Sequence, residues 1–341
     1  MKTKQQPIGS GFGAASTAAE VIRGVDLSGK TAIVTGGYAG IGLETVRVLA
    51  EAGATVIVPA RDKTKAAAAL QGIGKAGGQG IKNVELYEMD LIDPASIDAF
   101  ANAFLATNRP LSILINNAGI MANPLTRDAR GYESQLATNH LGHFQLTLRL
   151  WPALVRAAGA RVVSVSSWGH RFSPLDPEDP NFLHRPYDRW LAYGQSKTAN
   201  ILFAVKLDDI GRSAGIRAFS LHPGSIVGTD LSRYISQEDL RKAGVLDEQN
   251  KPILDPARGL KTIEQGAATS VWCATSPDLT GMGAVYCENN DIAPLISAEQ
   301  EAEMRKVSRP IGSRPLGVFP YAVDAVMADR LWRLSEELTS I

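Results

Sequence analysis

Short apolar runs alternate with longer amphipathic segments between residue 30 and about residue 290. Because most of the runs are apolar throughout, they predict strands buried on both faces, as in a parallel sheet covered by helices. The runs span 31–35, 55–60, 84–89, 111–116, 161–166, 216–221 and 283–287. Helical patterns fill the intervals, among them 41–53, 94–106, 135–155 and 196–211. This alternation predicts an α/β doubly wound fold: one mostly parallel seven-stranded sheet with right-handed crossovers and helices on both faces.

The domain organisation follows from the lack of a linker within this pattern. We expect a single domain over 28–295, preceded by an N-terminal arm over 1–27 and followed by a C-terminal extension over 296–341 that packs on the domain. The extension ends in an amphipathic helical pattern at 331–340. The sequence leaves open whether this helix caps the domain, covers the site or meets a partner subunit.

Two long segments, 168–192 and 232–260, interrupt the alternation. Both follow the carboxyl ends of predicted strands, where open α/β sheets bind their ligands, so both are candidate walls of a substrate site. Surface insertions without a role are the alternative. Their aromatic side chains favour an apolar or aromatic substrate; these are Trp168, Phe172, Phe182, Trp190 and Tyr234.

Composition narrows the classes of partner. The chain carries 35 basic and 35 acidic side chains, so no net charge attracts nucleic acid or an anionic membrane. Its two cysteines, Cys273 and Cys287, suit a reducing compartment rather than a disulfide framework. No run approaches the roughly 18–20 apolar residues of a membrane span, and the first residues lack the apolar core of a signal peptide. We therefore expect a cytoplasmic protein with no membrane span and no nucleic-acid partner.

The histidines do not predict a metal site. His140 and His143 lie three positions apart on one predicted helix, but no third ligand follows at a suggestive spacing. Packing and hydrogen bonding are the preferred interpretation of both, and His222, which precedes a Pro-Gly pair, is read as structural.

A glycine-rich turn follows the first predicted strand and includes Gly36, Gly37, Gly40 and Gly42. Glycines let the backbone turn tightly and approach a pyrophosphate, and the N-terminus of the next helix offers free N–H groups to the anion. A tight strand–helix connection without a ligand is the alternative. The position of this turn on the first strand of a parallel sheet favours dinucleotide binding.

The end of the second predicted strand bears on cofactor choice. Arg61 stands where NAD-specific sites usually have an acid, and its positive charge suits the 2′-phosphate of NADP. Asp62 complicates this interpretation, because its carboxylate could itself meet a ribose. A solvated turn residue is the alternative for Arg61, so NADP is preferred and NAD stays possible.

Candidate chemistry lies at Tyr193 and Lys197, which are four positions apart on one predicted helix. A free tyrosine has a pKa of about 10, and a neighbouring ammonium is expected to lower the pKa of Tyr193 toward working pH. A surface pair is the alternative. Ser166 and Ser167 end a strand, where a hydroxyl can stabilise a developing alkoxide. Asn139 interrupts a helical pattern, which indicates a kink, a water site or core hydrogen bonding.

These motifs together resemble the short-chain dehydrogenase/reductase family, whose members have a Rossmann fold. TGGYAGIG (35–42), NNAG (116–119), the Asn139 segment, the Ser167 strand end, YGQSK (193–197) and HPG (222–224) occur in the family's order. The resemblance covers roughly residues 28–290. Within the family, the chain looks most like the retinol-dehydrogenase-like and WW-domain-oxidoreductase-like members.

The resemblance implies roles for these residues. Tyr193 would exchange the proton with the substrate oxygen, and Lys197 would lower the pKa of Tyr193 and hold the nicotinamide ribose. Ser167 rather than Ser166 would steady the substrate oxygen. Asn139 would hold a water. Cofactor contacts are implied for Gly36, Tyr38, Gly40, Ile41, Gly42, Arg61, Asp90, Leu91, Asn116, Asn117, Ala118, Gly119, Tyr193, Lys197, Pro223, Gly224, Ile226 and Thr229.

Two departures from the family pattern affect these assignments. PGSIVGT (223–229) is one residue longer than the usual motif, so Ile226 and Thr229 are less secure. The 26 positions between Ser167 and Tyr193 are about double the usual gap, although the retinol-dehydrogenase-like members share such an insertion.

The sequence thus predicts an enzyme that transfers a hydride between a nicotinamide cofactor and a small-molecule alcohol or carbonyl, with a homo-oligomer as a possible assembly. A regulatory protein of the same fold that senses the dinucleotide without turning it over is the alternative. Such a protein needs the glycine turn but not the tyrosine–lysine pair.

Overall fold

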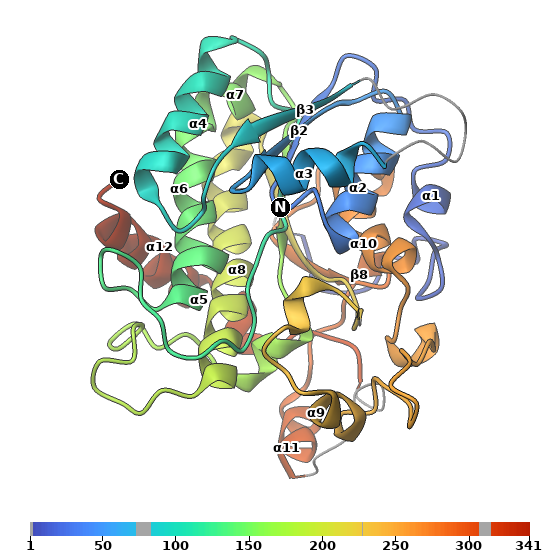
Figure 1. The fold of residues 1–341 in the computed structure, drawn as a ribbon, viewed down its shortest axis with the longest axis vertical. Helices are drawn as coiled ribbons and strands as arrows, with labels where there is room; N and C mark the ends of the chain where they lie inside the picture. Colours follow the sequence, from blue (N-terminus) through green and yellow to red (C-terminus); the bar gives the residue numbers. More distant parts are fainter. Residues whose placement is uncertain (1–2, 73–82, 227, 307–314) are drawn as a thin grey trace.

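One sheet organises the part of the chain that the computed structural model describes, which comprises residues 3–72, 83–226, 228–306 and 315–341 (Figure 1). The strand order is β3-β2-β1-β4-β5-β6-β7-β8. All neighbours pair in parallel except β7 and β8. The strands are β1 (Thr31–Val34), β2 (Thr55–Ala60), β3 (Val84–Glu88), β4 (Ile113–Asn116), β5 (Arg161–Val165), β6 (Arg217–His222), β7 (Val285–Glu288) and β8 (Asp291–Ile292).

The predicted fold class is confirmed, and the predicted number of strands needs one correction. Each of the seven expected runs forms a strand. The described residues add an eighth strand, β8, which pairs antiparallel with β7 after a tight turn at Asn289 and Asn290, both with positive φ. A strand of two residues is too short to produce a periodic pattern, so the sequence could not indicate it.

The strand order places a topological switch at the centre of the sheet. The chain adds β2 and β3 on one side of β1 and then returns to add β4 on its other side. The loops that leave β1 and β4 therefore diverge to opposite faces and open a crevice at the carboxyl ends of the strands. Ligands of such sheets bind there, and the glycine turn that follows β1 lies at this point.

The helices form two layers, one on each side of the sheet (Figure 1). No helix in the described ranges is long and apolar enough to cross a lipid bilayer. The α-helices are α1 (Ala18–Val21), α2 (Gly40–Glu51), α3 (Lys63–Leu70), α4 (Pro94–Ala106), α5 (Ser134–Leu136), α6 (Gly142–Arg149), α7 (Trp151–Arg156), α8 (Arg189–Gly211), α9 (Gln237–Lys242), α10 (Ile263–Thr275), α11 (Ala298–Lys306) and α12 (Ala325–Thr339). Three short helices of other types matter below: the π-helix η2 (Ala137–Leu141) and the 3₁₀ helices η3 (Trp168–Phe172) and η8 (Pro320–Val323).

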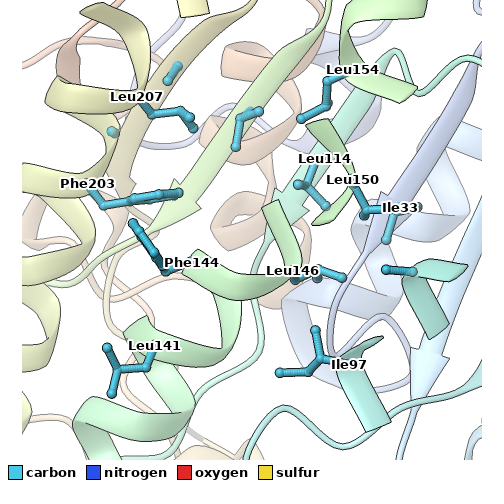
Figure 2. Close-up of a cluster of buried hydrophobic side chains, with 14 of the residues drawn as sticks. Ile33, Ile97, Leu114, Leu141, Phe144, Leu146, Leu150, Leu154, Phe203 and Leu207 are labelled. Atoms are coloured by element: carbon cyan, nitrogen blue, oxygen red, sulfur yellow. The ribbon is translucent and has the colours of Figure 1, made fainter. Parts of the chain in front are cut away.

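Two hydrophobic cores flank the sheet because side chains alternate along each strand. On β1, Val34 points into the core beneath α2 and α10, where Trp272 is fully buried. Ile33 points the other way, into the core that α4, α6 and α8 cover with Phe144 and Phe203 (Figure 2). Because both faces of each strand are buried, each strand needs apolar side chains at successive positions, and the sequence has this pattern.

The C-terminal helix α12 covers the outer face of α8. Trp332 stacks on Phe203 with ring centroids 5.9 Å apart and meets Phe144 edge-on at 4.9 Å. Ser335 Oγ lies 2.7 Å from His140 Nε2 in the buried part of this contact. Of the three roles that the sequence left open for this helix, these contacts fit a cap on the helical layer.

Helix α8 begins earlier than the amphipathic pattern at 196–211 predicts. The expected helix began at residue 196, whereas α8 begins at Arg189. Asp188 explains the difference, because its carboxylate accepts the N–H groups of Trp190 and Leu191, both at 2.8 Å, and so caps the helix. Tyr193 and Lys197 therefore both lie within α8, on one helix as their spacing predicts.

Most of the segment 168–192 is bonded internally. Asp179 accepts the backbone N–H groups of Leu183 and His184, and Arg127 donates to the carbonyl oxygens of Asn181 and Phe182. The Phe182 ring is 4% exposed and packs edge-on against Tyr187. The ring therefore fills the core of its own loop.

Candidate active site

The glycine turn between β1 and α2 leaves no room for side chains on its inner side. Gly36 and Gly40 have φ of +64° and +50°. A Cβ on Gly36 would lie 3.1 Å from the Ala118 Cα, and one on Gly42 would collide with the Gly36 carbonyl oxygen. The residue before α2 is Ala39, which has no side chain able to cap the helix. The first N–H groups of α2 therefore lack a side-chain cap, and the N-terminus of a helix favours an anion.

Thr35 connects this turn to the turn that follows β4. Its hydroxyl oxygen accepts the backbone N–H groups of Asn117 and Ala118, at 2.9 and 3.0 Å. The Asn117 amide in return donates to the Thr35 carbonyl oxygen at 2.8 Å. Gly119 follows next, and a Cβ there would lie 3.4 Å from Lys197 Nζ. The structure therefore brings the predicted cofactor residues of both turns to one place.

The other residues predicted to contact the cofactor lie in two places, the glycine turn and the loop after β3. Tyr38 and Ile41 are partly buried and pack against the core beneath α2. The Asp90 carboxylate accepts the N–H of Ile92 at 3.2 Å, which shapes the loop after β3, and Leu91 is buried at 7% exposure. These contacts hold the loop at the carboxyl end of β3, beside the crevice.

Asn139 lies in the π-helix η2, where it is fully buried. Its Oδ1 accepts the Ile120 N–H at 2.8 Å, and its Nδ2 donates to the Ile120 carbonyl oxygen and to Ser196 Oγ, at 3.0 and 2.9 Å. The Asn139 carbonyl oxygen meets His143 Nδ1 at 3.0 Å. The Asn139 side chain thereby links the loop after β4 to α8, one residue before Lys197.

Tyr193 and Lys197 lie next to each other on the buried face of α8. Lys197 Nζ lies 5.7 Å from the centroid of the Tyr193 ring and donates to the Val165 carbonyl oxygen at 3.1 Å. Burial lowers the pKa of Lys197 to about 8. The geometry confirms that the two side chains share one helix face, as their spacing predicts.

The expected effect of Lys197 on Tyr193 is not what the structure shows. Burial raises the pKa of Tyr193 to about 12, and a hydrogen bond from Ser167 opposes this rise. The physical reason is that Tyr193 is 3% exposed, so burial removes the phenolate from water and disfavours it. The phenol is therefore neutral at ordinary pH in this structure.

The two serines at the end of β5 have different partners. Ser166 Oγ donates to the Lys197 carbonyl oxygen at 2.7 Å and is buried, so it fastens α8 to the strand. Ser167 Oγ accepts the Gly169 N–H at 3.0 Å as the cap of η3 and hydrogen-bonds the Tyr193 side chain. The structure thus brings Ser167, the serine preferred from the sequence, to the phenol.

The segment after β6 lies against the glycine turn in spite of its extra residue. A Cβ on Gly40 would lie 3.1 Å from the Thr229 methyl group. Ile226 and Ile41 approach the same point on α10, at Gly266. Gly224 has φ +101° and follows the buried Pro223. Thr229 and Ile226 are therefore close to the glycine turn and the start of α2, whereas Gly224 lies against the Lys261 side chain and Val227 lies outside the described residues.

Arg61 and Asp62 differ in how the structure uses them. Arg61 is exposed at the end of β2. The Asp62 carboxylate accepts the Lys65 N–H at 2.9 Å and caps α3, so one of its oxygens is engaged. Lys65 Nζ pairs with Asp230 at 2.9 Å, a link between α3 and the segment after β6 that sequence reasoning missed. The two residues are 165 positions apart, and no local pattern signals the pair.

A row of aromatic rings runs outward from Tyr193. Trp190 meets Tyr193 at 6.5 Å between centroids, Phe172 meets Trp190 at 5.7 Å, and Trp168 meets Phe172 at 5.6 Å. Tyr234 is 44% exposed, and its carbonyl oxygen accepts a hydrogen bond from the Arg189 side chain at 3.3 Å. Of the five predicted aromatics, Trp190 thus meets the phenol ring, and Phe172 and Trp168 connect to it through Trp190.

Comparison with known proteins gives matches over most of the chain. The family model described as short chain dehydrogenase matches residues 30–240. A Streptomyces antibioticus protein described as "Probable oxidoreductase" is 45% identical over 309 residues, which cover 90% of this chain and 97% of that protein. Retinol dehydrogenase 12 of Homo sapiens is 37% identical over 284 residues, 82% of this chain and 84% of its own length.

A solved structure agrees with these matches. The crystal structure of an uncharacterized Mycobacterium paratuberculosis protein superposes with a TM-score of 0.68 and 33% identity, covering 96% of this chain and 98% of that one. The family model alone spans every residue discussed above from the glycine turn to Thr229.

Proposed function

The chain belongs to the short-chain dehydrogenase/reductase family, and from that premise we propose that it interconverts an alcohol and a carbonyl with NADP(H), using Tyr193 for proton transfer. The observation that carries this proposal is the arrangement around one buried phenol. Ser167 hydrogen-bonds it, and the Lys197 ammonium lies 5.7 Å from its ring. General acid–base chemistry needs a proton donor held in place in this way.

The cofactor site supports a dinucleotide. Gly36 and Gly42 let the turn after β1 pack closely on itself and on the turn after β4, and the uncapped start of α2 offers its N–H groups to a pyrophosphate. Among the described residues, Lys197 Nζ hydrogen-bonds the Val165 carbonyl oxygen alone, so its other hydrogens are available to the nicotinamide ribose. The nicotinamide ring supplies the hydride when it is bound.

The protein's own side chains carry out the proton transfer. Because burial raises the pKa of Tyr193 to about 12, its phenol carries the proton that a substrate carbonyl oxygen must receive during reduction. Ser167 orients that oxygen and stabilises the charge that develops on it. Asn139 acts at a distance, since its amide holds Ser196 beside Lys197.

NADP is preferred over NAD in this proposal because of the end of β2. Arg61 is exposed there and offers a guanidinium to a 2′-phosphate. Asp62, the residue that would favour the ribose hydroxyls of NAD, is engaged in capping α3. The substrate is proposed to be apolar or aromatic, because Trp190, Phe172 and Trp168 form an apolar wall that begins at Tyr193.

The test is turnover, followed as loss of NADPH absorbance with aryl aldehydes, aryl ketones and long-chain aldehydes. Tyr193→Phe removes the proton donor and little volume, so turnover should fall by about 10²–10⁴-fold while NADPH still binds. Tyr87→Phe is the matched control, because the Tyr87 hydroxyl on β3 contacts Glu85 of the same strand and Arg109 between α4 and β4. Binding of NADPH without turnover of any carbonyl would favour the dinucleotide-sensing alternative, and near-normal turnover in Tyr193→Phe would refute the role of this residue.

A further inference from the structure

The segment 315–321, far from the site in the sequence, is bonded to η3 from two sides. Arg171 on η3 donates to the carbonyl oxygen of Pro315 at 2.9 Å and also to that of Gly317. The Tyr321 hydroxyl donates to the His170 carbonyl oxygen at 2.8 Å. Both contacts are at least partly buried, so water does not compete freely for these groups.

His170 connects the segment 315–321 to Ser167 by hydrogen bonds. Its Nε2 accepts the Phe319 N–H at 3.4 Å, which leaves the ring proton on Nδ1. Nδ1 lies 2.8 Å from the Ser167 carbonyl oxygen and donates to it. Burial lowers the pKa of His170 to about 3, so the neutral ring keeps this direction of bonding at ordinary pH. A continuous series of bonds therefore runs from Phe319 to Ser167.

The helix η3 has little freedom to shift without moving the reacting groups. The Gly169 N–H donates to Ser167 Oγ at 3.0 Å. A Cβ on Gly169 would lie 2.7 Å from Tyr193 Cε1, so the backbone of η3 touches the phenol ring. A displacement of η3 changes the distance between Ser167 and the phenol, and misplacement of this kind lowers turnover steeply.

Gly317 is held from both ends. Its N–H donates to the Glu288 carboxylate at 2.9 Å, and its carbonyl oxygen accepts from Arg171. Glu288 ends β7 and is 4% exposed. Arg171 is 6% exposed and its guanidinium lies over the rings of Trp168 and Phe319, at 4.9 and 5.5 Å. The segment is thus anchored on the sheet and transmits that anchor to η3.

We infer that the segment 315–321 is a positioning element of the active site, which sets Ser167 against Tyr193 through His170 and Arg171. The part of this inference that concerns turnover rests on the proposed function of Ser167. The bonding from 315–321 to η3 stands apart from that function, so its test includes a readout that needs no substrate.

Amide hydrogen exchange of Gly169 and His170 provides that readout, because both N–H groups donate to Ser167. Tyr321→Phe deletes one hydroxyl, and Arg171→Lys keeps the charge but loses the forked contact to two carbonyls. Both variants should speed exchange at these two amides about tenfold, the effect of a lost hydrogen bond. Asp329→Asn is the control: it removes a C-terminal ion pair, 2.6 Å from Lys206 on α8, that does not touch η3. Unchanged exchange in Tyr321→Phe would overturn the inference even if Arg171→Lys fails to fold.

Kinetics separates positioning from general stability. Tyr321→Phe should lower kcat with an aryl aldehyde about tenfold and leave KM for NADPH unchanged, while Asp329→Asn changes neither. In a Ser167→Ala background, Tyr321→Phe should have no further effect on kcat, because the residue acts through Ser167. Additive losses would refute the inference. If the wild-type protein turns over no carbonyl, the proposed function fails, and the exchange experiment still decides whether 315–321 positions η3.

Discussion

The hydroxyl of Thr35 lies 2.8 Å from Nε2 of His143, joining the end of β1 to α6 beneath the glycine turn. The other hydrogen bond of the His143 ring determines which of the two groups donates. His143 Nδ1 donates to the Asn139 carbonyl oxygen, so Nε2 accepts, and Thr35 donates to it while accepting two N–H groups from the turn after β4. One hydroxyl at the end of β1 therefore bonds to polar groups of both α6 and the turn after β4.

Thr35→Val is expected to lower both stability and cofactor affinity. Loss of the hydroxyl leaves two backbone N–H groups and a buried imidazole nitrogen without their partner, which costs about 1–3 kcal/mol each for groups that stay unsatisfied. Urea unfolding and titration with NADPH measure the two effects. Thr275→Val is the matched control, because its hydroxyl donates to the Val271 carbonyl oxygen of its own helix, at 2.8 Å. Equal effects of the two changes would contradict the linking role of Thr35.

Cofactor affinity should depend on the charge of Lys197. Burial lowers its pKa to about 8, so the ammonium is present below this pH and lost as the pH rises through it. An amine makes weaker hydrogen bonds to the ribose, so the Kd for NADP should rise up to about tenfold between about pH 7.5 and about pH 9. Fluorescence titration across this range measures it.

Two variants assign this pH dependence. Lys197→Met should bind NADP weakly at every pH and show no inflection near pH 8. Lys261 is a second buried lysine whose pKa burial lowers to about 8, and its stem lies against Gly224. Lys261→Met should keep the inflection if Lys197 is the group that titrates. If Lys261→Met removes the inflection instead, Lys261 rather than Lys197 is the group that titrates, and the prediction is wrong.

Arg61→Ala should change cofactor preference. A charge-assisted contact to a 2′-phosphate contributes about 1.5–3 kcal/mol, so the Kd for NADP should rise roughly ten- to a hundredfold while that for NAD stays nearly constant. Arg23→Ala removes the same charge from an exposed position next to α1 and serves as the control. Wild-type protein that binds NAD as tightly as NADP would show that Arg61 does not select the cofactor.

The protein should lose stability in mild acid because of its buried histidines. Burial lowers the pKa of His140 to about 3, of His143 to about 4 and of His170 to about 3. The unfolded chain takes up protons below its histidine pKa of about 6.5, whereas the folded protein does not until about pH 4. The stabilising contribution is therefore complete above pH 6.5 and is lost as the pH falls toward about 4.

Urea unfolding at about pH 7 and about pH 5 measures this loss. His140→Gln keeps a hydrogen-bonding side chain and cannot take up a proton, so the difference in unfolding free energy between the two pH values should shrink by up to about 2 kcal/mol. His184→Gln, at an exposed position, is the control and should change the difference far less. An unchanged difference in His140→Gln would mean that this histidine does not contribute to acid unfolding.

Local patterns were enough to predict the framework. Runs such as 31–35 and 55–60 are strands because a sheet covered on both faces needs apolar side chains at successive positions, and this requirement is written in adjacent residues. The same holds for the glycine turn, where Gly36 and Gly40 adopt positive φ, and for the pair Tyr193 and Lys197, which a helix brings together whatever surrounds it. The order of these motifs also identified the family.

Burial and contacts between distant residues could not be predicted in this way. Nothing near Tyr193 in the sequence indicates that burial, rather than Lys197, dominates its pKa, because desolvation depends on every element that packs around the phenol. Phe182 looks like its aromatic neighbours until the loop closes on it. Arg171 and Gly317 meet across 146 positions of sequence. The sequence by itself therefore determined which elements form and which residues share a helix or a turn, because those relations span only a few residues. The tertiary structure alone decided which side chains lose contact with water and which distant segments contact η3 beside Ser167, because those relations depend on how all the elements pack together.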